Sequence, residues 1–129
     1  MANMQKKEST EDYLERILML SQRNNVVRSI DIANDMFFSK PSVSIAMKKL
    51  KEDNYITIDD NGYIYLTEKG YECATKIYER HNIIAESLMA LGVDKETAFS
   101  DSCKIEHDIS DITFSKIKEH YLSKVKKEQ

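Results

Sequence analysis

The sequence lacks any apolar run that approaches the roughly 20 residues needed to cross a membrane. Its beginning, Met-Ala-Asn-Met-Gln-Lys-Lys, also lacks the hydrophobic core of a signal peptide. The sequence also lacks an excess of basic over acidic residues, since its formal net charge is -3 at pH 7. We therefore expect a cytoplasmic protein without a membrane partner, in which any nucleic-acid binding rests on local clusters of basic side chains.

Cysteine is scarce as well. In a reducing cytoplasm we expect Cys73 and Cys103 to be reduced thiols or a metal ligand rather than a structural disulfide. The chain has 129 residues, of which 32% are charged. This size is enough for one hydrophobic core and an appended helical segment.

Three helices are predicted in the first part of the chain. Ser9 is a plausible N-cap of a helix that continues to about Gln22, and Ser29 of a short second helix. A third begins after the N-cap Ser39, with Pro41 in its first turn, where the missing N–H costs nothing. Apolar residues at helical spacing predict the three buried faces: Leu14, Ile17 and Leu18; Ile32, Ala33, Met36 and Phe37; Val43, Ala46, Met47 and Leu50.

A hairpin follows the third helix. Asn61-Gly62 lies between the β-branched and aromatic runs Tyr55–Ile58 and Tyr63–Leu66, and the favoured two-residue turn needs a positive φ at both central residues. Three helices followed by a two-stranded wing are the order of a winged helix-turn-helix. We assign this DNA-binding domain to residues 1–70.

The outer face of the third helix has the chemistry of a DNA-contacting surface. Its lysines can neutralise phosphates, its serines can bond to base edges, and its outward apolar residues can contact thymine methyl groups. An ordinary solvated lysine-rich face is the alternative. The residues of this face are Lys40, Pro41, Ser42, Ser44, Ile45, Lys48 and Lys49, with Lys51 at its margin.

The remainder, residues 71–129, is predicted to be a helical metal-binding and dimerisation domain, so the fold class is mainly α. A long helix from Glu68 to about Leu91 stops at Gly92, and Asp94 and Ser110 can cap two more. The buried stripe of the long helix consists of Ala74, Ile77, His81, Ile84, Leu88 and Leu91. Because the closing helices are too short for an independent core, we expect a homodimer.

The pentad Cys103-Lys-Ile-Glu106-His107 has the spacing of a metal site. On a helix its thiol, carboxylate and imidazole project from one face, and this donor mixture suits a first-row divalent metal. The alternative is a small buried Cys with two solvated polar residues.

Further donors lie on other helices: Asp12, Glu15 and His81. Alone, Asp12 could complete a cap, Glu15 could be an exposed acid, and His81 a hydrogen-bonded core residue. Together the six supply oxygen, nitrogen and sulfur donors, and Asp12, Glu15, Glu106 and an ionised Cys103 would form a repulsive anionic cluster that a divalent ion neutralises.

Several motifs carry a resemblance to a known family: Thr10-Glu-Asp-Tyr-Leu-Glu15, Pro41-Ser-Val-Ser44, Leu66-Thr-Glu-Lys-Gly70, Arg80-His81 and Asp101-Ser-Cys-Lys-Ile-Glu-His107. In these motifs and their order the chain resembles the diphtheria toxin repressor family, most closely the short manganese transport regulators that lack an SH3-like domain. The resemblance implies an acidic pair at Asp12 and Glu15, a histidine ligand at His81, and two further ligands at Glu106 and His107.

The sequence departs from the short manganese regulators at Cys103, where they have a carboxylate. The iron-responsive branch has a cysteine there, but its second metal site would fall on Ala85 and Phe99, which cannot bind a metal. A thiolate favours iron, cobalt and zinc, whereas the acidic pair favours manganese. The resemblance therefore implies a cofactor of Mn2+ or Fe2+, with Co2+ and Zn2+ as surrogates.

These observations predict a homodimeric, metal-dependent repressor of metal uptake genes that binds a palindromic double-stranded DNA operator, with no small organic ligand. One alternative is a small metalloenzyme in which Glu106 is a general base beside metal-bound water. The other is a winged-helix thiol switch that uses Cys73 and Cys103.

Overall fold

The computed structural model describes the backbone of residues 2–128 and the side chains of residues 10–125. Within this part the chain forms two compact units, of which the first ends at Lys76 and the second begins at Ile77. The predicted fold class, mainly α with a winged helix-turn-helix, is confirmed. The elements are α1 (Ala2–Asn24), α2 (Ser29–Met36), α3 (Lys40–Glu52), β1 (Ile56–Ile58), β2 (Ile64–Leu66), α4 (Glu68–Ala90), α5 (Lys95–Asp108) and α6 (Asp111–Glu128).

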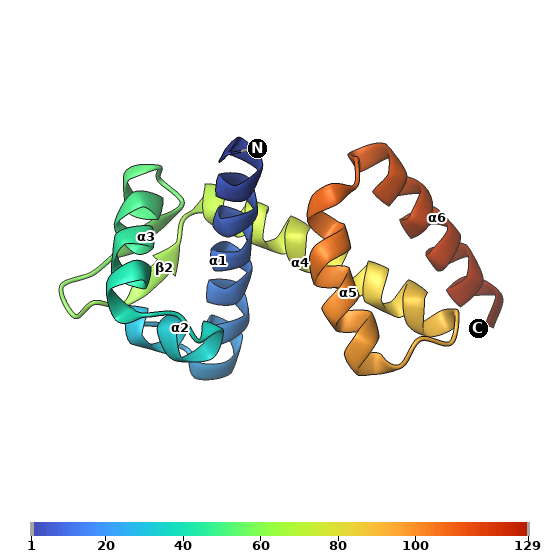
Figure 1. Cartoon of the computed structure of the whole chain (residues 1–129), viewed down its shortest axis with the longest axis horizontal. Helices are drawn as coiled ribbons and strands as arrows, with labels where there is room; N and C mark the ends of the chain where they lie inside the picture. Colours follow the sequence, from blue (N-terminus) through green and yellow to red (C-terminus); the bar gives the residue numbers. More distant parts are fainter. Residues whose placement is uncertain (1, 129) are drawn as a thin grey trace. The chain divides into compact units, whose positions relative to one another are not determined.

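The core of the first unit lies between α1, α2, α3 and the hairpin (Figure 1). Its largest fully buried side chains include Leu14 and Ile17 of α1, Ile32 of α2 and Met47 of α3. The predicted buried faces of α1 and α3 are thus confirmed, although Ala46 is only half-buried. One prediction was wrong: α1 begins at Ala2, so Ser9 lies inside the helix rather than at its cap. The preceding residues are good helix formers, which extends the helix toward the N-terminus.

The turn between α2 and α3 differs from the prediction at Phe37. This residue adopts the left-handed conformation, with φ 58°, and its N–H bonds to the carbonyl of Ala33 as the cap of α2. The turn directs its side chain into solvent, where it is 94% exposed, instead of into the core. The cap at the start of α2 is Arg28 rather than Ser29. The predicted cap of α3 is confirmed, since Ser39 accepts a hydrogen bond from the N–H of Ser42.

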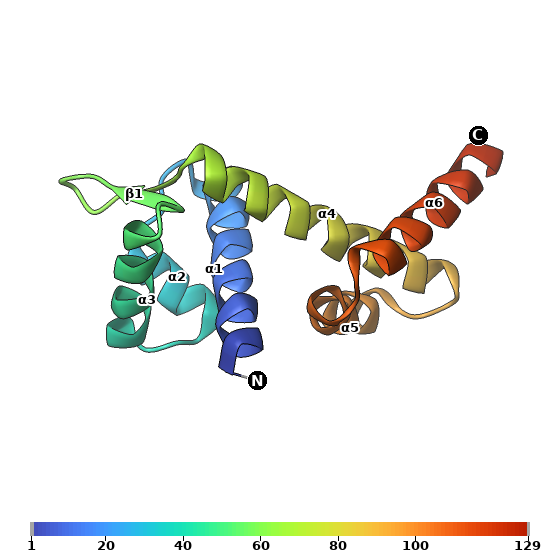
Figure 2. The ribbon, with the colours of Figure 1, turned by 90° about the horizontal axis from the view of Figure 1, so that it is seen from above.

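The hairpin is present, but its turn is longer than predicted. Antiparallel pairing joins Ile56 to Leu66 and Ile58 to Ile64. Gly62 has φ 80°, whereas Asn61 does not take a positive φ, so the two-residue turn does not form. Instead the Asp59 carboxylate accepts hydrogen bonds at 2.9 Å from the N–H groups of Asn61 and Tyr63, which closes a longer loop. The loop extends away from the helices of its unit (Figure 2).

The first turn of α4 is fixed to the hairpin by close backbone contact. Thr67 donates its hydroxyl proton to the carbonyl of Asn54 at 2.6 Å and accepts from the N–H of Gly70 at 3.1 Å. A Cβ atom on Gly70 would lie 2.0 Å from the carbonyl oxygen of Tyr55. Only glycine fits there, which explains its place in the motif that ends at residue 70.

The second unit consists of the later part of α4 with α5 and α6. Gly92, with φ 104°, follows α4, and Asp94 caps α5 by accepting from the N–H of Thr97, as predicted. These hydrogen bonds from Thr97 hold the pKa of Asp94 below its ordinary value. Leu91, predicted to be buried, is 78% exposed because α4 ends one residue earlier. Within residues 2–128 there is no helix that is both long and apolar enough for a membrane span.

Candidate metal centre and DNA-contacting face

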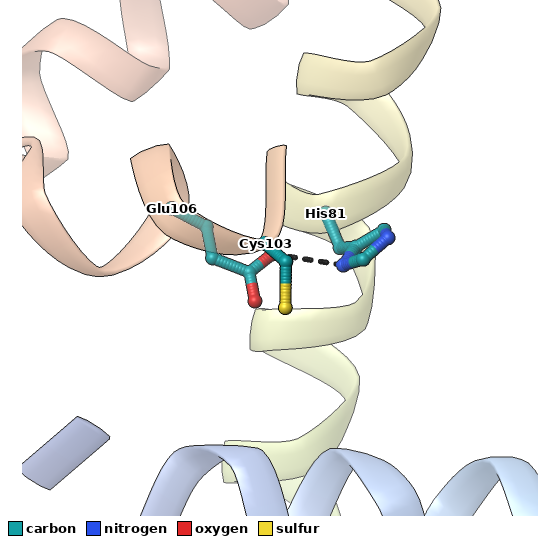
Figure 3. Close-up of side chains that lie close together, drawn as sticks. All are labelled: His81, Cys103 and Glu106. Carbon is teal, nitrogen blue, oxygen red and sulfur yellow. Dashed lines mark ion pairs between the residues drawn. The ribbon is translucent and has the colours of Figure 1, made fainter. Parts of the chain in front are cut away.

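Three potential metal donors converge in the second unit. Single donor atoms of His81, Cys103 and Glu106 all lie within 4.8 Å of one another. Figure 3 shows Cys103 and Glu106 extending from α5 toward His81 on α4. The helical spacing of three residues places the thiol and the carboxylate on one face of α5, as predicted. The approach of His81 depends on the packing of α4 against α5.

Glu106 is the centre of this cluster. Its side chain is 0% exposed, and its two carboxylate oxygens lie 3.3 Å from Nδ1 of His81 and 3.4 Å from Nε2 of His107. A charge buried so deeply is costly unless it is neutralised by partners or by a metal. Because Glu106 and His107 are both sequestered from solvent, the interpretation of this pair as solvated polar residues is wrong.

The donors of this cluster fit a divalent transition metal. They comprise the imidazole of His81, the carboxylate of Glu106 and the half-buried free thiol of Cys103, which match the ligand preference of first-row divalent ions, and the imidazole of His107 lies near the other oxygen of Glu106. The ring of His81 also packs against that of Phe99, with centroids 5.4 Å apart, which restricts its orientation. A restricted imidazole needs little further ordering when it binds an ion.

The acidic pair predicted as ligands, Asp12 and Glu15, lies three residues apart on α1 in the first unit. Asp12 is half-buried and Glu15 is buried. Burial, aided by the nearby Asp12 carboxylate, raises the pKa of Tyr13. Arg16 of the same helix contacts Asp35 at 2.8 Å and so connects α1 to α2. The participation of the acidic pair in a metal site remains a prediction.

The predicted DNA-contacting face of α3 is accessible to solvent. Ile45 is 72% exposed, which is unusual for a large apolar side chain and is consistent with a role in contact. The hydroxyl of Ser42 accepts a hydrogen bond from Ser39 at 2.8 Å and keeps its own proton for donation. The other predicted residues are also exposed: Lys40, Pro41, Ser44, Lys48 and Lys49.

Two arginines with structural roles near these sites were not predicted. The guanidinium of Arg28 lies 4.7 Å from the ring centroid of Tyr63 and so connects the start of α2 to the wing. Arg80, next to His81, is only 7% exposed. A signal for Arg80 exists in the sequence, because it lies three residues after Ile77 and four before Ile84, on the buried stripe of α4.

The second unit also carries an apolar groove of about 580 Å³. It is formed by the end of α4 with parts of α5 and α6, and exposed Leu91 and Ile112 are among its lining residues. Large exposed apolar patches on proteins commonly mark sites that bind another molecule.

Comparison with family models gives matches over nearly the whole chain. Residues 7–64 match the N-terminal DNA-binding domain of iron-dependent repressors. Residues 67–127 match the metal-binding and dimerisation domain of the same repressors. The first match contains α3, β1 and the loop of the wing, and the second contains His81, Cys103, Glu106 and His107.

Individual proteins give the same result. An uncharacterised HTH-type transcriptional regulator of Methanocaldococcus jannaschii is 36% identical over 113 residues, which cover 86% of this chain and 90% of that protein. The HTH-type transcriptional regulator MntR of Bacillus subtilis is 33% identical over 79% of this chain and 72% of its own length. The solved structure of the manganese regulator SloR is 30% identical, with a TM-score of 0.76 over 86% of this chain. The chain spans about half the length of that structure, 52%.

Proposed function

The chain belongs to the iron-dependent repressor family of metal-dependent transcriptional regulators, and we propose that it is a homodimeric repressor that binds a palindromic operator when loaded with Mn2+ or Fe2+. The observation that carries the proposal is the buried carboxylate of Glu106 between two imidazoles and beside a thiol. Because the family consists of regulators and not of enzymes, the metalloenzyme alternative is set aside. We further propose metal uptake genes as targets, by analogy with regulators of this kind.

We propose that the metal ligands are His81, Cys103, Glu106 and His107 of the second unit, completed by Asp12 and Glu15 of α1. The support is the chemistry of the donors: the acidic pair adds the hard oxygen ligands that manganese prefers, while Cys103 adds a soft sulfur. A bound divalent ion supplies positive charge, which offsets the mutual repulsion of the carboxylates and the thiolate. The metal preference therefore depends on how strongly Cys103 binds.

The proposed regulation is a coupling between metal binding and DNA binding. Asp12 and Glu15 belong to the unit that carries α3, and the other four donors belong to the unit that matches the dimerisation domain. Shared ligation would reduce the conformational freedom of the two DNA-binding units before they meet the operator. Typical coupling free energies of about 1–3 kcal/mol correspond to metal-induced changes of about 5- to 150-fold in DNA affinity.

The proposed DNA contacts are those of α3. Lys40, Lys48 and Lys49 neutralise phosphates, and the hydroxyls of Ser42 and Ser44 bond to base edges. Pro41 and the exposed side chain of Ile45 contact thymine methyl groups. The wing follows α3 in the chain and has its loop shape fixed by Asp59.

The proposed dimer buries exposed apolar surface of the second unit. Leu91, Ile112 and Leu122 are large apolar side chains that remain exposed in the single chain. A second copy would remove them from water at a gain of about 25 cal/mol for each Å² of apolar area. Two copies related by a twofold axis would also present two α3 helices to the half-sites of a palindrome.

The function is tested by DNA selection with a dimer control. A randomised duplex library is selected against the purified protein in the presence of Mn2+ or, anaerobically, Fe2+, and the selected duplex is then titrated with metal or with EDTA. His81→Ala and Glu106→Ala should abolish metal-stimulated binding, whereas the mass in solution should remain that of a dimer. Metal-stimulated binding that persists in both variants would refute the site, and a monomeric mass at micromolar concentration would refute the dimer.

A further inference from the structure

Arg80 is a buried cation on α4, directly before His81. Its side chain is only 9% exposed although it carries a permanent charge. Burial of a guanidinium is costly unless its N–H donors find acceptors, so its hydrogen bonds indicate what it holds in place.

The acceptors of Arg80 lie at the junction of α5 and α6. One terminal nitrogen of the guanidinium, Nη2, donates to the carbonyl oxygens of Ile109 and Ser110, each at 3.2 Å. The same nitrogen lies 3.6 Å from the carboxylate of Asp111, and the guanidinium carbon lies 5.0 Å from the ring centroid of Phe114. Because the Asp111 side chain is 78% exposed, its charge is well solvated and the two carbonyls are the stronger partners.

These carbonyls directly follow the last turn of α5. Ile109 is the C-cap residue of α5, and Glu106 and His107 lie three and two residues before it. The carbonyl of Ser110 also accepts the N–H of Phe114 in α6, so Arg80 binds the short link that joins the end of α5 to the start of α6. Arg80 thus connects the end of α5 to the same turn of α4 that carries His81.

We propose that Arg80 is a positioning residue for the metal site: it sets the distance and orientation of the α5 donors relative to His81. This inference rests on the metal site of the proposed function. Ligand atoms must be held within about 0.5 Å of their productive geometry, and Arg80 is a direct hydrogen-bonded link between the two ligand-bearing helices. Loss of groups that orient metal ligands typically weakens metal binding by about 10- to 100-fold.

Two substitutions separate the hydrogen bonds from the charge and the bulk of the side chain. Arg80→Met keeps much of the apolar stem and removes every donor. Arg80→Lys keeps the charge but replaces the planar guanidinium with a single ammonium that cannot match its geometry. Lys118→Met is the matched control, because Lys118 is a cation that forms an ion pair with Glu79 and so links α6 to α4.

The experiment measures Mn2+ and Co2+ binding by direct titration of the full chain, with the helical circular dichroism of the metal-free protein recorded beside it. We expect both Arg80 variants to bind either ion about 10- to 100-fold more weakly. We also expect a weaker near-ultraviolet charge-transfer band from the Cys103 thiolate to Co2+, because the thiolate no longer meets the ion at its normal distance. Lys118→Met should bind both ions as the parent chain does.

The outcomes distinguish this inference from the function on which it rests. If the parent chain binds neither ion, the proposed metal site fails and the role of Arg80 fails with it. If the parent chain binds and both Arg80 variants bind equally well with an unchanged Co2+ spectrum, the metal site stands and the positioning role is refuted. Should Arg80→Met lose its helical structure, Arg80→Lys alone decides between these results.

Discussion

The Nδ1 atom of His81 lies 3.3 Å from a carboxylate oxygen of Glu106 whose side chain is fully buried. The two residues come from different helices and are 25 positions apart in the chain. A metal bound at this contact would stabilise the folded state, because the unfolded chain does not hold the two donors together.

Replacement of Glu106 by Gln should remove this stabilisation. With Mn2+ at about 100 times its dissociation constant, the free energy of unfolding of the parent chain should rise by about 2.7 kcal/mol relative to the chain in EDTA. Glu106→Gln keeps the shape but lacks the charge, so its unfolding should not respond to the ion. Denaturant titration measures both values. Glu96→Gln, in the first turn of α5, is the control and should respond as the parent does.

Replacement of Cys103 by Glu should change the preference among metals. A carboxylate in place of the thiolate removes the soft donor that favours Co2+ and Zn2+ over Mn2+. The ratio of Co2+ to Mn2+ affinity should therefore fall, by about tenfold or more. Competition titration of the two ions measures this ratio. An unchanged ratio would show that Cys103 is not a ligand.

Cys73→Ser is the control for the cysteine experiment and also tests the thiol-switch alternative. Cys73 lies on α4 in the first unit, whereas the donors of the cluster lie in the second. We expect this variant to keep the parent's metal-stimulated DNA binding in the presence or absence of a mild oxidant. A response to oxidant in the parent chain that the variant loses would instead support regulation by thiol chemistry.

Replacement of Lys48 by Ala should weaken DNA binding and reduce its dependence on salt. Each lysine that neutralises a phosphate contributes about one unit to the slope of the logarithm of affinity against the logarithm of salt concentration. A dimer contains two copies, so the slope should become shallower by about two units. Lys95→Ala, an exposed lysine of α5, should leave the slope unchanged. An unchanged slope for Lys48→Ala would remove this residue from the phosphate contacts.

Replacement of Gly70 by Ala should destabilise the first unit. The added Cβ would lie 2.0 Å from the carbonyl oxygen of Tyr55, and backbone atoms on both sides would have to move. Such overpacking typically costs about 1–3 kcal/mol. The exposed side chain of Glu72 is on the same helix, and Glu72→Ala should change stability by less than about 0.5 kcal/mol. Chemical denaturation of both variants measures the difference.

The elements predicted correctly from the sequence are those with local causes. Ser39 and Asp94 cap helices through bonds to residues three positions later, and Gly92 follows the end of α4. The errors concern where helices begin and end. The exposure of Phe37 follows from where α2 ends, which hydrophobic periodicity does not define to the residue.

The candidate site was predictable to a similar extent. Helical spacing alone places Cys103 and Glu106 on one face of α5. The contact of Glu106 with His81 depends on the packing of two helices, and the spacing of residues does not predict it. The partners of Arg80 are backbone carbonyls about thirty residues later in the chain. Because every residue has a backbone carbonyl, the sequence does not indicate which carbonyls accept these hydrogen bonds.

The closed loop of the wing also carries charges of the opposite sign from those on α3. Asp59 and Asp60 are exposed at the loop, whereas Lys40, Lys48 and Lys49 are exposed on α3. The approaching negative field of a duplex repels the loop carboxylates and attracts the lysines. If α3 contacts DNA as proposed, this attraction would favour encounters in which its lysines face the duplex before any base is contacted.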